Sequence, residues 1–193
     1  RLGLERQLTI AALRMVVQLS LVALILEALF HAVSPWLTAA AALTMVLFAG
    51  REARARQDRP LAGWWGYGLG TGAMLFAGAV VTVFALTTQV RPDPWYHPQY
   101  AIPLLGMILG NCMTGVAIGL NALLGRAGRE RGAIEAMLAL GYRREEALRP
   151  LVREAVRAGL IPIVNAMAAT GLVSLPGMMT GQILSGIAPV EAV

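Results

Sequence analysis

The chain has 193 residues, of which 57% are hydrophobic and 14% are charged, and its formal net charge is +5. This composition excludes an ordinary soluble domain, and several apolar runs reach the roughly 17–25 residues that cross a bilayer as a helix. All sixteen basic residues are arginine, which excludes a phosphate-binding loop ending in Gly-Lys-Ser/Thr and a lysine Schiff base.

We therefore expect an all-α polytopic membrane protein with about five transmembrane helices, forming a single domain over residues 1–193. Because the chain begins with Arg1 rather than methionine, we expect further spans at one or both ends. The arginine excess is explained by the positive bias of cytoplasmic loops, so a membrane lipid environment is expected and a nucleic-acid partner is not.

The first apolar run covers residues 8–30 and contains Arg14 and Gln18, one helical turn apart. Ionisable groups inside a membrane are costly and by default face protein or water. Arg14 therefore either extends to the headgroups or has a structural or pathway role. A second run covers residues 36–50, and the arginine-rich segment 51–60 that follows is expected in the cytoplasm.

The third and fourth apolar runs cover residues 64–90 and 101–124. Glycines at small-x-x-x-small spacing, where another helix can approach closely, open the third run: Gly66, Gly68, Gly70 and Gly72. The segment between the runs is rich in proline and aromatic residues and is expected at the outer headgroups. Its Asp93 and His97 make at most a weak metal site. Asn111 lies deep in the fourth run, where its amide needs a partner, and shares a helix face with Met107.

The only long polar segment is residues 125–159, which holds eight of the sixteen arginines. Apolar residues and a glycine at helical spacing form one stripe on it: Ile134, Met137, Leu138 and Gly141. Gly141 suits a left-handed helix cap, and a second amphipathic helix is expected from Tyr142. We predict a cytoplasmic loop with a helical elbow that binds a partner protein.

The last apolar run covers residues 160–175, is interrupted by Pro176-Gly177 and continues over residues 178–186. A Pro-Gly pair at membrane depth frees backbone groups that lipid cannot satisfy, so this backbone must be buried in protein or line a cavity. Broken helices of this kind indicate a transport pathway. In this topology only Arg91 falls on the outer side, and the other fifteen arginines lie in or beside the inner segments.

The run from Gly171 to Gly181, with Pro189 shortly after it, strongly resembles the permease subunit of the Fet-type iron-export ABC transporters. That family includes the plant half-transporters tied to aluminium tolerance. Further matches are Arg14 with Gln18, the segment from Pro103 to Met113, Asn121, and the segment from Arg157 to Pro162.

The resemblance implies a permease of the bacterial inner membrane that forms a homodimer and pairs with a separate ATP-binding-cassette (ABC) ATPase, with two copies of each subunit. ATP and Mg²⁺ would bind to that partner. No bound cofactor and no enzymatic activity are therefore expected of this chain.

The resemblance also indicates where the ATPase binds. Residues 125–159 are similar to the cytoplasmic coupling loop by which ABC permeases dock onto their ATPase. The residues assigned to docking are Glu135, Ala136, Met137, Leu138 and Gly141. Ala136 and Gly141 are small, so that the helix can seat closely. The usual pattern continues with an I-x-L-P sequence about nine residues after the glycine, and this chain departs from it at Leu151, Arg153 and Glu154. We expect the docking geometry to differ accordingly.

Side chains expected to line the transport pathway are Met107, Asn111, Met113, Ser174, Pro176, Gly177, Met178, Met179 and Gln182. Thioethers suit copper(I) better than iron, and carboxylates are scarce in these runs, so an iron substrate would be loosely held or chelated. For each methionine alone, packing is the simpler interpretation, and any metal ligand set is unknown.

Other functions stay open. One is a permease of the same architecture for another metal, a nucleotide sugar or a lipid, and another is an ATP-independent secondary transporter. An intramembrane hydrolase is disfavoured, because both histidines, His31 and His97, lie in outer loops and Ser174 has no base near it in the sequence.

Overall fold

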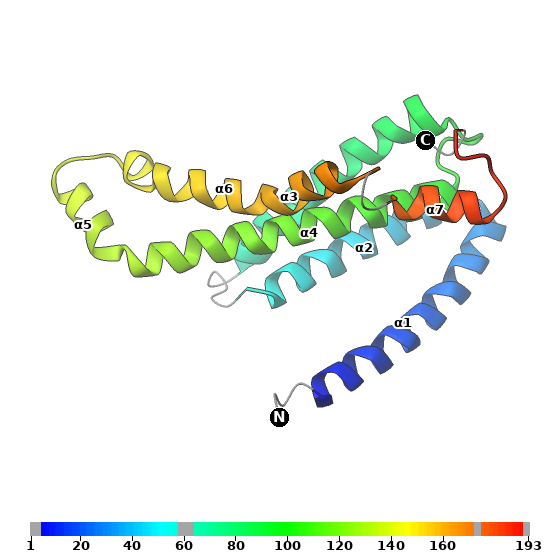
Figure 1. Cartoon of the computed structure of the whole chain (residues 1–193), viewed down its shortest axis with the longest axis horizontal. Coiled ribbons are helices and arrows are strands. Elements are labelled where there is room, and N and C mark those ends of the chain that lie inside the picture. The colour runs from blue at the N-terminus through cyan, green and yellow to red at the C-terminus, as the bar shows by residue number, and fades with distance from the viewer. Residues whose placement is uncertain (1–4, 58–63, 172–174, 191–193) are drawn as a thin grey trace. The chain divides into compact units, whose positions relative to one another are not determined.

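The computed structural model describes residues 5–57, 64–171 and 175–190, and its regular elements are all helices (Figure 1). In chain order they are α1 (Glu5–Ala32), α2 (Pro35–Ala55), α3 (Trp64–Ala85), the π-helical segment η1 (Leu86–Val90), α4 (Pro98–Arg129), α5 (Arg131–Ala139), α6 (Arg144–Ala169) and α7 (Gly177–Leu184). The all-α prediction is confirmed. The chain separates into two compact units, Arg1–Glu52 with Ala62–Cys112 and Ala53–Leu61 with Met113–Val193.

Among the described residues, three helices are long and apolar enough to cross a membrane: Leu8–Ala32, Gly66–Val90 and Pro98–Arg129. They correspond to the first, third and fourth predicted spans. The second and last predicted spans, in α2 and α6, do not reach this standard. The apolar part of α2 ends where Arg51 and Glu52 begin, and α6 carries charged residues through its first half.

The first unit has a core of apolar side chains from α2, α3, η1 and α4, and its most deeply buried members include Val46, Met74 and Leu86. At one point α2 and α3 are so close that a Cβ on Gly50 would overlap the Thr71 hydroxyl. Helix α1 belongs to this unit, yet its most apolar window has no buried residue. That surface must therefore be covered by lipid or by protein outside the described residues.

In the second unit, α4 and α6 cross at four small residues. A Cβ on Gly159 of α6 would lie 2.7 Å from the carbonyl oxygen of Gly115 in α4. A Cβ on Gly119, one turn further along α4, would lie 3.2 Å from the carbonyl oxygen of Ala155. The two backbones are thus in direct contact, which is the small-x-x-x-small packing of membrane helices.

The expected polar loop of residues 125–159 is not separate from the flanking helices. Helix α4 continues through its first residues to Arg129, and α6 begins at Arg144 and runs without interruption past Pro150 and Pro162. Only α5 and its two short connections form the turn. We call residues 130–143 the elbow. Charged residues on one side of a long helix do not end it, so the helices extend into the polar segment from both sides.

The predicted break near Pro176-Gly177 is confirmed, but it begins earlier than expected. Helix α6 ends at Ala169, not Leu175. Thr170 is extended, and Gly171 has a φ of 86°, in the left-handed region that glycine adopts without strain. Helix α7 then begins at Gly177 with Pro176 as its N-cap residue.

Candidate functional site

The elbow ends α5 with the cap that the sequence predicts. Gly141 has a φ of 90°, the backbone N–H of Gly141 donates to the carbonyl of Leu138 at 3.0 Å, and the N–H of Tyr142 donates to the carbonyl of Met137 at 3.1 Å. This pair of hydrogen bonds is a Schellman motif, in which glycine takes the left-handed position. The prediction for Gly141 is therefore confirmed, and the turn from α5 into α6 is fixed by its own backbone.

The surface of α5 has two distinct sides. Residues at helical spacing on one side are all exposed, and all but the glutamate are small: Gly132, Glu135, Ala136 and Ala139. On the other side Ile134 and Met137 are half-buried, and α5 contacts α6. We call the four exposed residues the small face. Because three of its four residues are glycine or alanine, a partner could approach the α5 backbone closely on this face.

The docking residues assigned by resemblance are divided between these two sides. Glu135 and Ala136 belong to the small face, whereas Met137 lies around the helix from it and is half-buried. Leu138 is 42% exposed at the edge, and no atom would lie within 4 Å of a Cβ on Gly141. The apolar stripe predicted from sequence is therefore only partly available to a partner.

The charged groups of the elbow are held by local contacts. The Arg131 guanidinium donates to the Glu135 carboxylate at 2.7 Å, and this hydrogen bond raises the pKa of Arg131. At the start of α6, the Glu146 carboxylate accepts a hydrogen bond from the backbone N–H of Arg143 at 2.9 Å. Such a contact satisfies a backbone donor at a helix N-terminus, so it orders the second half of the elbow.

The base of the elbow is crossed by an ion-pair cluster that the sequence did not predict. Arg126 of α4 binds the Glu130 carboxylate, with the Nη2–Oε1 distance at 2.9 Å, and also pairs with Glu154 of α6. Nearby, the Asn121 amide donates to the backbone carbonyl of Arg56 at 3.0 Å. Residues 126 and 130 have the spacing of a helical ion pair, but nothing in the sequence indicates the third partner.

The predicted pathway residues lie on two helices. On α4, Met107 and Asn111 share one exposed face, and Met113 is half-buried. At and within α7, Pro176, Gly177 and Met178 are exposed, and Met179 and Gln182 are half-buried. Ser174 lies outside the described residues. The structure thus leaves most of these side chains accessible, and their role in a pathway stays a prediction.

No group of three or more His, Cys, Asp or Glu side chains that could hold a metal occurs in the part of the chain that the structure describes. The His97 ring accepts a weak hydrogen bond, at 3.4 Å, from the backbone N–H of Gln99 and contacts the Tyr100 ring edge-on, so it has a local structural role. Arg14 lies 3.8 Å from the Glu52 carboxylate of α2, and the Gln18 side chain is exposed. The ion pair favours a structural role for Arg14.

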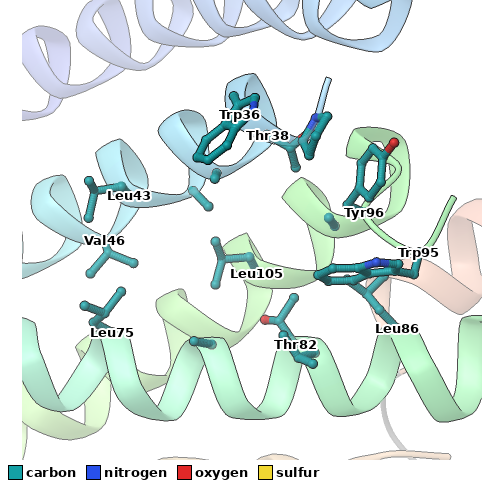
Figure 2. A pocket seen from close by; sticks show the side chains of 16 residues that line it. Trp36, Thr38, Leu43, Val46, Leu75, Thr82, Leu86, Trp95, Tyr96 and Leu105 are labelled. Carbon is teal, nitrogen blue, oxygen red and sulfur yellow. The ribbon is translucent and has the colours of Figure 1, made fainter. Parts of the chain in front are cut away.

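The first unit also contains an apolar cavity of about 630 Å³ (Figure 2). Its lining comes from α2, α3, η1, α4 and the segment between η1 and α4, and none of the predicted pathway residues is part of it. Aromatic side chains of Trp36, Trp95 and Tyr96 stand around one end. The Thr82 hydroxyl is buried among the lining residues and makes no hydrogen bond.

Comparison with known proteins assigns the chain to a family. Over residues 1–193 it matches the family described as "Uncharacterised protein family (UPF0014)". A membrane protein of that family from Synechocystis is 38% identical over 194 residues, which cover 99% of this chain and 73% of the relative. The Arabidopsis thaliana protein named ALUMINUM SENSITIVE 3 is 32% identical over 193 residues, covering 100% of this chain and 68% of the relative.

The Escherichia coli protein named "Probable iron export permease protein FetB" is 34% identical over 197 residues, covering 100% of this chain and 72% of the relative. The chain therefore spans about 70% of the length of these relatives. No solved structure matches. The resemblance inferred from Gly171–Gly181 is confirmed. With three helices long and apolar enough to cross a membrane, the chain is a multi-pass membrane protein of the UPF0014 family.

Proposed function

We propose that this chain is the membrane subunit of an ABC transporter and that its elbow docks onto a separate ATPase subunit. The observation that carries the proposal is the small face of α5, in which Gly132, Ala136 and Ala139 leave the helix backbone accessible. A partner groove can approach such a helix closely, as small residues permit at helix contacts. Two copies of the chain and two ATPase subunits form the working assembly, and Mg²⁺ and ATP bind to the ATPase.

The membrane part of this assembly has five spans from this chain. Besides the three long apolar helices, α2 and the second half of α6 also cross the bilayer. The unburied apolar surface of α1 is available to contact lipid or the second copy of the chain. This arrangement places the elbow and the arginine-rich ends of the helices in the cytoplasm.

The contact between α4 and α6 allows a movement of the elbow to be passed to both helices. Because the two backbones touch at Gly115 and Gly159, the helices move as one body when the ATPase pushes on α5. Beyond this body, the extended Thr170 and left-handed Gly171 separate α6 from α7. We propose that closure of the ATPase pair tilts α4 with α6 and shifts α7 against the pathway.

The proposed substrate is a metal ion, with iron export as the first choice. The name of the Escherichia coli relative supports this choice. The available pathway side chains are thioethers and amides, which hold iron weakly, so the ion would be released readily or carried as a chelate. The alternative is a lipid or another substrate with apolar groups, and the apolar cavity with its unpartnered Thr82 hydroxyl favours it.

The proposed function predicts substrate-stimulated ATP hydrolysis. The chain would be reconstituted with its ATPase in lipid vesicles, and hydrolysis measured with ferrous iron, other divalent metals, aluminium and a nucleotide sugar. We expect iron to raise the hydrolysis rate and to move out of the compartment that holds the ATPase. Stimulation by an organic ligand alone would discard the metal substrate, and transport without ATP would discard the ABC assignment.

Replacing Pro176 with alanine is expected to impair transport more than expression. Proline fixes φ at the N-cap of α7, and alanine would let α7 extend backwards into the break. The measurement is transport by an equal amount of purified variant, compared with its yield from the membrane. An equal loss of yield and transport would instead make Pro176 a folding residue.

A further inference from the structure

A row of three arginines runs along α6 on the side that faces away from α4. On α6, Ala147, Leu151, Ala155 and Gly159 form one stripe, in which the first three residues are buried and the last two meet α4. Residues two positions further along a helix lie about 200° around its axis. That places Arg149, Arg153 and Arg157 opposite the contact stripe, and all three are exposed. We call these three residues the arginine row.

The crossing with α4 sets the depth of the arginine row. Gly159 meets Gly115 and Ala155 meets Gly119, so the two helices run antiparallel in a fixed register. By that register Arg157 lies level with Ala117, and Arg153 with Asn121. A hydrocarbon core about 30 Å thick takes about 20 helical residues, and counted from residue 101, where the fourth apolar run begins in the sequence, it reaches residue 121. The arginine row therefore crosses the inner boundary of the bilayer.

The side chains around the arginine row suit a lipid surface. One position before each arginine is an exposed or half-exposed apolar residue, and this second row continues to the apolar end of α6: Leu148, Val152, Val156 and Leu160. The side chain of Val156, for example, is 56% exposed. The branched apolar side chains can contact lipid acyl chains. The neighbouring arginines can extend from the edge of the hydrocarbon core to the phosphate groups of the lipids.

None of the three arginines has an ion-pair or hydrogen-bond partner among the residues that the structure describes. The acids nearest to them in the chain do not neutralise them. Glu154 pairs with Arg126, and Glu146 accepts a hydrogen bond from the backbone of Arg143. Glu145 shares a shallow groove with Arg149 and Arg153 and makes no ion pair with any residue that the structure describes. Three positive charges in one row along α6 therefore remain available to external anions.

We propose that the arginine row binds the phosphate groups of anionic phospholipids in the inner leaflet. Arginine binds phosphate with paired, charge-assisted hydrogen bonds, and basic clusters next to a membrane-crossing helix attract anionic lipid. The apolar row and the depth favour a lipid over an acidic surface of the ATPase, which would lie beyond the headgroups. Bound lipid anchors α6 just above the elbow, so the elbow moves relative to a fixed membrane level.

The test is lipid binding by the purified full chain, measured by native mass spectrometry during titration with phosphatidylglycerol or phosphatidylcholine. We expect the wild-type chain to prefer phosphatidylglycerol. The variant Arg149→Gln/Arg153→Gln/Arg157→Gln should lose about fivefold in affinity per arginine, as expected for charges at a membrane surface. The variant with lysine at the same three positions should keep most of the preference.

A matched control removes three other exposed arginines of the same unit, Arg129→Gln/Arg131→Gln/Arg143→Gln, none of which lines the groove of Arg149 and Arg153, and should leave phosphatidylglycerol binding almost unchanged. An equal loss in the control would show that only net charge matters and would overturn the site. Unchanged lipid binding in the first variant, with loss of ATPase binding, would assign the row to the protein partner. If the triple variant does not fold, Arg153→Gln alone must still show about a fivefold loss.

Discussion

Replacing Ala136 with arginine is expected to abolish binding of the ATPase while the membrane helices stay folded. Ala136 is exposed on the small face, so the long side chain meets no atom of its own chain and costs little stability. In a docked complex the same charge would be buried without a partner. An unpaired charge at an interface costs about 3 kcal/mol or more, which weakens binding by a factor of roughly a hundred.

The measurement is co-purification of the ATPase with the tagged chain, together with a dissociation constant in detergent. The control is Ala133→Arg, which makes the same change on an exposed residue at the flank of the same helix. It should retain most of the binding. Normal binding by the Ala136 variant would contradict docking through the small face. Equal loss in both variants would assign docking to the whole of α5 and reject this face as the specific contact.

The sequence predicts the parts of this fold that depend on local chemistry. Apolar runs located the long helices, because a membrane span must satisfy its own backbone hydrogen bonds. Gly141 was predicted as a left-handed cap, and it has that conformation, because a helix end of this kind is determined by a few neighbouring residues. The break before α7 was also predicted, since proline and glycine act on the backbone directly.

Contacts between distant segments could not be predicted in the same way. The glycines from Gly66 to Gly72 and the pair Gly115 and Gly119 have similar spacing in the sequence. Gly115 and Gly119 meet another helix, whereas a Cβ on Gly68, Gly70 or Gly72 would have no neighbour within 4 Å. Spacing shows that a helix can be approached closely, but it does not specify which helix approaches.

The surface of α5 shows the same limit at a smaller scale. Helical periodicity correctly placed Ile134 and Met137 on one side of α5, and apolarity suggested that a partner would bind there. In the structure these two side chains are half-buried and α5 contacts α6, so the opposite side is exposed. An apolar stripe identifies a surface that becomes buried, and the protein's own neighbouring helix competes with any partner for it.

Replacing Gly159 with alanine is expected to destabilise the second unit by about 2 kcal/mol, although alanine is the better helix former by about 1 kcal/mol. The new Cβ would lie 2.7 Å from the Gly115 carbonyl oxygen, so a backbone and not a flexible side chain must move. The matched control is Gly110→Ala on α4, where a Cβ has no neighbour within 4 Å, and it should be neutral or slightly stabilising.

Thermal unfolding in detergent compares the stability of the two variants, and coupling is measured as transport per ATP hydrolysed. In the proposed mechanism the α4–α6 contact transmits the motion of the elbow, so Gly159→Ala should also lower this ratio while the ATPase still binds. Equal stability of the two variants would contradict the backbone contact. Lost stability with normal coupling would support the backbone contact but contradict its role in transmitting the motion of the elbow.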